Sequence, residues 1–117
     1  MIATGLQINW DKVKGLKDAI GKDGVCTNYS YLYAPSTYEF IQKTTSGNAI
    51  FTFPNTPVKC AGAPQKIMYL ADWNWRKSNV RDNIKIDFVT AGDKLFAVKK
   101  YSDSLVSFTF AQLFIIH

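Results

Sequence analysis

The sequence has little of several residue types, and each shortage excludes a class of protein. Its single histidine is the last residue, His117, and only two cysteines occur among 117 residues. No His and Cys cluster has the spacing of a zinc site, so no metal site is predicted. Two cysteines are too few for a disulfide framework. The most apolar stretch, 105–116, is shorter than the about 20 residues that a membrane-spanning helix needs.

Positive charge is in excess, but the basic residues are not clustered in the sequence. The chain has fourteen lysines and arginines and nine acidic residues, and the basic residues are spread from Lys12 to Lys100. No basic stripe alternates with stacking aromatics, so no nucleic-acid partner is predicted. Residues 1–5 lack the charged and apolar regions of a secretory leader, and no targeting segment is recognised. The 47% hydrophobic content fits one small domain with a buried core.

Proline is also scarce, and three of the four prolines lie in the stretch 53–66, which also holds Cys60. The short apolar run 48–53 before it predicts a central strand covered on both faces. From Pro64 to about Lys77, apolar residues recur at helical spacing. Because proline fixes the backbone angle φ, we expect a stiff loop that carries a thiol at a strand-to-helix junction.

The fold class predicted is α/β. Residues 84–90 alternate apolar and polar side chains, which is typical of a second strand. Strand, loop, helix and strand over 48–90 form one Rossmann-like βαβ unit, because parallel strands need such a crossover. Other elements are expected as a strand end at 2–5 and helices at 12–20, 35–43 and 95–105.

The loop of this βαβ unit does not carry the nicotinamide fingerprint. That fingerprint needs Gly-x-Gly-x-x-Gly and an acidic residue near the end of the second strand. The loop has one glycine, Gly62, and the nearest acid, Asp93, lies beyond the turn that follows the second strand. We therefore predict a Rossmann-like scaffold without a nicotinamide site.

Cys60 is the strongest candidate for chemistry. A helix start and the positive charges of Lys59 and Lys66 both favour a thiolate. The residues alone leave the alternative equally open, in which Cys60 is a small residue that fills a tight turn. Cys26 has no charged or proline-rich surroundings, and we expect it to be a small half-buried residue.

The segment Ala49–Leu70 resembles the active-cysteine segment of eukaryotic, mitochondrial sulfide:quinone oxidoreductases. Shorter stretches on both sides are also similar to that family, and the resemblance extends over roughly 1–105. It implies a flavoprotein with two Rossmann-like domains. Residues 1–10 would then form the end of the last strand of the FAD-binding domain and the crossover to the second domain. Residues 11–105 would form the N-terminal part of that second domain, which carries the redox cysteine.

The resemblance also implies a function. Cys60 matches one of two redox cysteines beside FAD, where hydrogen sulfide forms a persulfide and electrons pass through FAD to ubiquinone. A small thiol or another acceptor takes the sulfur, and Lys59 and Lys66 are candidates for attracting an anionic acceptor. Thr4 and Gly5 match residues near FAD. The family is mitochondrial and associated with the inner membrane, through a C-terminal part that does not match this chain.

The departures from the family are equally specific. The FAD fingerprint and the second redox cysteine are not found, so we expect this chain alone to be inactive. Residues 106–117 do not match, and Val106-Ser107 is how a common splice-donor sequence translates. We hypothesise that this tail derives from an intron; the alternative is a genuine terminal strand or helix. Three alternatives also remain open. The chain could be a part of another two-domain flavin reductase, such as a type II NADH dehydrogenase. It could also be a non-catalytic thiol-bearing α/β module or a non-functional product.

Overall fold

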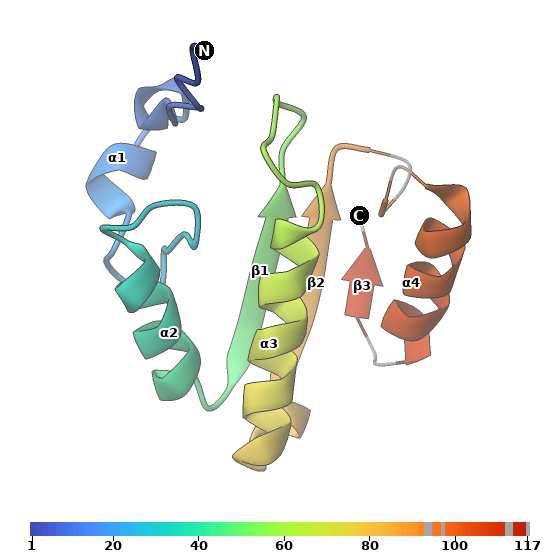
Figure 1. Cartoon of the computed structure of the whole chain (residues 1–117). Coiled ribbons are helices and arrows are strands. Elements are labelled where there is room, and N and C mark those ends of the chain that lie inside the picture. Colours follow the sequence, from blue (N-terminus) through green and yellow to red (C-terminus); the bar gives the residue numbers. More distant parts are fainter. Residues whose placement is uncertain (93–94, 97, 112–113, 117) are drawn as a thin grey trace. The chain divides into compact units, whose positions relative to one another are not determined.

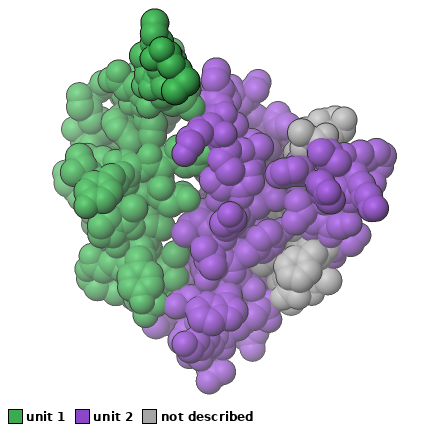
Figure 2. Space-filling model, in the orientation of Figure 1, with its two compact units in different colours: residues 1–43 green, residues 44–117 purple. Residues whose placement is uncertain are grey.

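The computed structural model describes residues 1–92, 95–96, 98–111 and 114–116, which fall into two compact units. Unit 1 comprises residues 1–43 and unit 2 comprises residues 44–117, shown in green and purple in Figure 2. Among the described residues, no helix is both long enough and apolar enough to cross a membrane.

Unit 2 is a parallel sheet with helical crossovers, as Figure 1 shows. Its strands are β1 (Gly47–Phe53), β2 (Ile84–Thr90) and β3 (Phe114–Ile116), in the order β1-β2-β3. The helices α3 (Ala63–Lys77) and α4 (Lys99–Ala111) make the two crossovers that parallel strands require. The predicted α/β class and the βαβ unit are confirmed.

The core of unit 2 lies between α3 and one face of the sheet. The Phe51 ring of β1 meets the Trp75 ring of α3 with 6.5 Å between the ring centroids. The buried apolar side chains are Met68, Ala71 and Trp75 from α3 and Ile84, Ile86 and Phe88 from β2. Helical spacing on α3 and alternation on β2 place these side chains on facing surfaces. Removing one large apolar side chain from water stabilises the fold by about 1.5–3 kcal/mol.

The prediction that the strand at 48–53 is central and covered on both faces is wrong. β1 lies at the edge of the sheet, and β2 is the central strand. The side chain of Ile50 points away from the face that Phe51 uses, because successive side chains on a strand alternate. Ile50 is 63% exposed, so only one face of β1 is covered.

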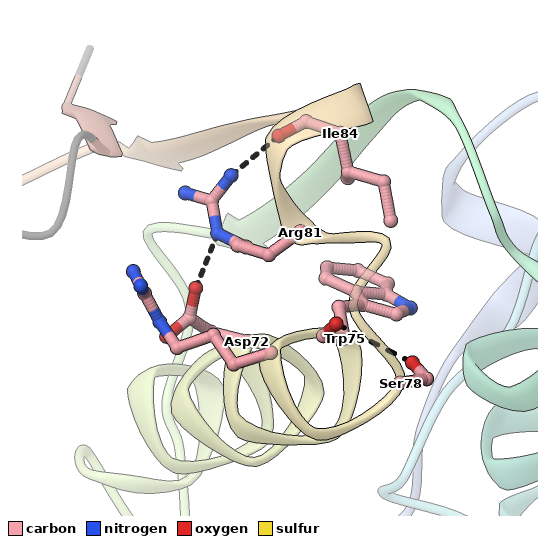
Figure 3. A network of polar contacts seen from close by, with 6 residues as sticks. Asp72, Trp75, Ser78, Arg81 and Ile84 are labelled. Atoms are coloured by element: carbon pink, nitrogen blue, oxygen red, sulfur yellow. Dashed lines mark hydrogen bonds and ion pairs between the residues drawn. The ribbon is translucent and has the colours of Figure 1, made fainter.

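A buried ion pair joins α3 to the start of β2, as Figure 3 shows. Asp72 lies on α3, and Arg81 lies on the short 3-10 helix η2 (Arg81–Asn83) that leads into β2. The Arg81 Nε donates to Asp72 Oδ1, and the Arg81 Nη1 donates to the Ile84 carbonyl at 2.6 Å. Arg76 Nε donates to the other Asp72 oxygen at 2.7 Å. These contacts fix where β2 begins relative to α3.

Unit 1 contains η1 (Trp10–Lys12), the single helical turn α1 (Leu16–Ala19) and α2 (Ala34–Lys43). The helix predicted at 35–43 is confirmed. The continuous helix predicted at 12–20 is wrong, because Gly15 adopts a left-handed φ of 82° and separates η1 from α1. The Trp10 and Tyr33 rings pack edge to face within this unit, with centroids 6.1 Å apart.

Two further predicted elements differ from the structure. Residues 2–5 form no strand; Ile2 is 91% exposed, and no strand of the described residues pairs with this segment. A strand needs a neighbour to receive its backbone hydrogen bonds, which explains the difference. The helix predicted at 95–105 begins only at Lys99. Leu95 lies before it, buried, and its carbonyl accepts a hydrogen bond from the Gln65 side chain of α3. Asp93 lies outside the described residues.

For the apolar tail at 106–117, the sequence allows either an intron-derived segment or a genuine terminal strand or helix. Its described residues continue α4 to Ala111 and form β3 at Phe114–Ile116. β3 pairs in parallel with β2, with Ile86 opposite Phe114. The conformation does not test the origin of the tail, so the intron hypothesis stays a prediction.

Candidate functional site

Cys60 lies in the loop that connects the carboxyl end of β1 to the start of α3, beyond the strand tips in Figure 1. It is exposed, and the loop residues before it, from Pro54 onward, are also exposed. Both cysteines of the chain are thiols rather than members of a disulfide. The predicted position of the thiol, at a strand-to-helix junction, is confirmed. The carboxyl ends of parallel strands are also where ligands bind in open α/β sheets.

Backbone hydrogen bonds connect Cys60 to the first turn of α3. The Ala63 N–H donates to the Cys60 carbonyl at 3.3 Å, and the Lys66 N–H donates to the Gly62 carbonyl at 3.0 Å. Pro64 occupies the first turn, where its missing N–H leaves no helical hydrogen bond unmade. Cys60 thus stands two residues before the helix cap, Gly62, at the positive end of the helix.

Lys59 and Lys66 are both exposed, one in the loop beside Cys60 and the other in the first turns of α3. Water and salt screen the charges of exposed lysines. The geometry therefore allows them to raise the local concentration of an anion, as a modest and salt-dependent effect. Their role at Cys60 stays a prediction.

A second loop, between β2 and α4, adjoins the first turn of α3. The side chain of Gln65 is buried, and its Nε2 donates to the carbonyl of Leu95, which is also buried. At Gly62, an added Cβ would lie 3.6 Å from the ring of Phe96. The Phe96 ring in turn packs edge to face with Tyr101, with centroids 6.2 Å apart.

Sequence reasoning missed Gln65. The signal that could have found it is its helical spacing, because Gln65 precedes the buried Met68 by three residues and Asp72 by seven. Positions three and seven apart share one face of a helix. A glutamine on the buried face needs a hydrogen-bond partner, and Leu95 supplies one.

Thr4 and Gly5 belong to unit 1, whereas Cys60 belongs to unit 2. Both are exposed and lie outside regular secondary structure. Gly5 adopts a φ of 70°, and a Cβ added there would meet nothing within 4 Å. A left-handed glycine with open space around it lets another group approach the backbone closely. The role of Thr4 and Gly5 beside FAD stays a prediction, and the sequence offers no glycine-rich phosphate loop to hold that cofactor.

The expectation that Cys26 is half-buried is wrong, because this thiol is exposed. It follows a tight turn closed by an isolated bridge between Lys22 and Val25. Gly21 and Gly24 have positive φ angles in this turn. Cys26 is therefore an exposed thiol of this chain outside the Cys60 loop, and it is a natural internal control.

No group of three or more metal-ligating His, Cys, Asp or Glu side chains occurs within the part of the chain that the structure describes. An open hollow of about 430 Å³ lies at the other end of the sheet. Its lining includes Gly47 and Ile84, the first residues of β1 and β2, so it is a full strand length from the Cys60 end.

Fold and site together define an α/β protein with a parallel, Rossmann-like βαβ unit and an exposed thiol in its strand-to-helix loop. No protein-family model matches the chain. Several curated proteins do, and three of them are named mitochondrial sulfide:quinone oxidoreductase. The chain is 53% identical over 106 residues to the protein of Dictyostelium discoideum, 48% over 105 residues to that of Mus musculus and 47% over 108 residues to that of Schizosaccharomyces pombe.

These matches cover 90% or 91% of this chain but only 23–24% of each relative. The resemblance inferred from the sequence is thereby confirmed, and the chain spans about a quarter of the length of the sulfide:quinone oxidoreductases that it matches. The relatives are oxidoreductases by name, and their names also place them in mitochondria. The domain boundaries at residues 10 and 105 and the roles of individual residues stay predictions.

Proposed function

We propose that this chain supplies the redox-cysteine segment of a mitochondrial sulfide:quinone oxidoreductase, with Cys60 as the sulfur that receives sulfide. The observation that carries the proposal is the position of Cys60. It is exposed on the loop at the carboxyl edge of a parallel sheet, in a chain about half identical to three proteins with that name.

The chemistry starts from a disulfide between Cys60 and a second cysteine, which this chain does not supply. Hydrosulfide attacks the Cys60 sulfur, the disulfide bond breaks, and the second cysteine leaves as a thiolate. Cys60 then holds a persulfide, whose outer sulfur passes to a small thiol or another acceptor. The disulfide is thus reduced by two electrons as the sulfide sulfur is oxidised, and re-forming it requires an electron acceptor.

FAD, when bound, would take that electron pair and pass it to ubiquinone. Thr4 and Gly5 are the residues of this chain that would lie near FAD, because Gly5 leaves its backbone open to close approach. Most of the FAD site, the second cysteine and any membrane-contacting part would come from sequence beyond the matched quarter. We expect the 117-residue chain alone to be inactive as an oxidoreductase.

The exposed positions of Cys60 and Lys59 support attack by a small anion, because nothing in the loop from Pro54 to Cys60 is buried. The start of α3 favours negative charge in front of it. Negative charge that develops on the Cys60 sulfur would therefore be favoured by the helix start, and the exposed sulfur would be within reach of a solvent-borne acceptor. Lys59 and Lys66 would attract an acceptor of negative charge.

The sulfur step can be tested on this chain without FAD. Both thiols are first converted to mixed disulfides with 5-thio-2-nitrobenzoate, which replaces the missing cysteine as the leaving group. Attack of hydrosulfide on a cysteine sulfur releases the coloured thiolate and leaves a persulfide on that cysteine. Rates depend on the attacked sulfur and on access to it, and peptide mass spectrometry assigns the persulfide.

We expect the persulfide to form faster at Cys60 than at Cys26, which is exposed in the same chain. Variants with Cys26→Ser and Cys60→Ser separate the two rates. Equal rates at both positions, or attack only on the nitrobenzoate sulfur, would contradict the proposal and favour a non-catalytic thiol-bearing module.

A further inference from the structure

We infer that Gln65 is a positioning residue for Cys60. Its side chain holds the first turn of α3 against the loop after β2 through a hydrogen bond. This inference rests on the proposed role of Cys60 and adds a residue to that site. The contact is the hydrogen bond from Gln65 Nε2 to the carbonyl of Leu95, thirty residues further along the chain.

Burial makes this hydrogen bond consequential. Gln65 is 3% exposed and Leu95 is also 3% exposed, so water cannot replace either partner of the bond. A buried amide that loses its hydrogen-bond partner destabilises the fold, because nothing then compensates for its lost hydration. The two loops at the carboxyl edge of the sheet are therefore fastened at a point where opening is unfavourable.

Gln65 occupies the third position of α3, and its side chain makes an unusual hydrogen bond for that position. At that position a glutamine commonly reaches back to the cap residue and closes the helix start locally. The cap here is Gly62, which has no side chain to reciprocate. The Gln65 amide instead bonds across to the second loop, and the Phe96 ring packs close to Gly62 beside it.

The path from this contact to Cys60 is short. The carbonyl of Cys60 accepts the N–H of Ala63, the first residue of α3, two positions before Gln65. The other end of the thiol loop leaves β1 at Phe53, whose carbonyl accepts the N–H of Ala91 at 3.2 Å. Both ends of the loop are thus tied to the chain that follows β2, and Gln65 provides the tie on the helical side.

Spin-label mobility tests the positioning directly. A nitroxide is attached to Cys60 in a Cys26→Ser background, and to Cys26 in a Cys60→Ser background as the control. Gln65→Met keeps the length and volume of the side chain but removes the donor. We expect narrower spectral lines, which report greater mobility, for the label at Cys60 and no change for the label at Cys26.

Two further variants keep the test decisive if Gln65→Met lowers the folded fraction. Gln65→Asn retains an amide that is one methylene too short to reach Leu95, and Phe96→Ala removes the packing beside Gly62 while Gln65 stays intact. Both are expected to loosen the Cys60 label. Folded Gln65 variants, judged by far-ultraviolet circular dichroism, with label spectra identical to the parent would overturn the inference.

The sulfide reaction then separates this inference from the function on which it rests. In the nitrobenzoate assay we expect Gln65→Met to lower the rate at Cys60 towards that at Cys26, with the Cys26 rate unchanged. A looser label with an unaltered Cys60 rate would overturn the positioning role alone. Equal rates at both cysteines of the parent chain would overturn the proposed function and leave the mobility result standing.

Discussion

Asp72 of α3 and Arg81 of η2 form an ion pair in which each side chain is only 10% exposed. Arg81 also donates to the carbonyl of Ile84, the first residue of β2. One guanidinium thus connects the carboxyl half of α3 to the start of the central strand (Figure 3). This contact sets the geometry of the crossover at the end of the sheet opposite to Cys60.

We expect Arg81→Met to destabilise unit 2 by about 3–5 kcal/mol, because breaking a buried pair leaves an under-compensated charge. The remaining contact from Arg76 to Asp72 places the expected loss at the lower end of that range. Urea unfolding followed by circular dichroism measures it. The double variant Asp72→Leu, Arg81→Met is the matched control and should lose less than the single variant. A single variant as stable as the parent would show that the pair contributes nothing.

Trp75 and Trp73 offer a matched pair on one helix. Trp75 is 2% exposed and packs on Phe51, whereas Trp73 is 59% exposed and lies under the ammonium of Lys77 at 5.1 Å. We expect Trp75→Ala to cost about 3–5 kcal/mol of unfolding free energy. Trp73→Ala should change it by less than about 1 kcal/mol, because an exposed cation–π contact contributes little. Thermal unfolding of both variants checks the difference. Equal losses of unfolding free energy would contradict the assignment of Trp75 to the core.

Gly47 starts β1 with a φ of 105°, in a region that other residues rarely adopt. We expect Gly47→Ala to destabilise the chain by about 1–2 kcal/mol through backbone strain. Gly62→Ala is the control, since Gly62 has a φ of −87° and its new Cβ would make an ordinary contact with Phe96. Chemical unfolding should separate the two variants. A neutral Gly47→Ala would mean that β1 begins in a different conformation.

The charge around Cys60 can be tested with two alkylating agents that differ in charge. Iodoacetate is an anion and iodoacetamide is neutral, so the ratio of their rates at one thiol reports the local potential. We expect Lys59→Gln combined with Lys66→Gln to lower this ratio at Cys60 and to leave it unchanged at Cys26. The difference should shrink at high salt, because exposed charges are screened over about 10 Å at 0.1 M. A ratio at Cys60 that ignores both substitutions would remove the two lysines from the site.

Local patterns predicted unit 2 well. The apolar run before Pro54 and the alternation at 84–90 predicted the two strands, and the helical spacing of Ile67, Leu70, Ala71 and Trp75 predicted α3. These elements are specified by which side chains face one core, and such periodicity is visible in a sequence. The strand-to-helix position of Cys60 followed from the same patterns.

The misses have physical causes that no short window contains. Whether β1 is an edge or a central strand depends on which strands pair with it, and the sheet order settles that. The late start of α4 depends on Leu95, whose carbonyl accepts the Gln65 amide from a distant helix. The break at Gly15 depends on a left-handed backbone angle that a helical pattern does not reveal.

The most direct test of the central claim is a chimera of the Dictyostelium discoideum relative in which the matching segment is replaced by residues 1–105 of this chain. Sulfide-dependent quinone reduction by the purified chimera is measured with and without the substitution Cys60→Ser. We predict an active chimera whose activity is lost in the Cys60→Ser variant while the fold is retained. A Cys60→Ser chimera that reduces quinone as fast as its parent would contradict the assignment of Cys60 as the redox cysteine.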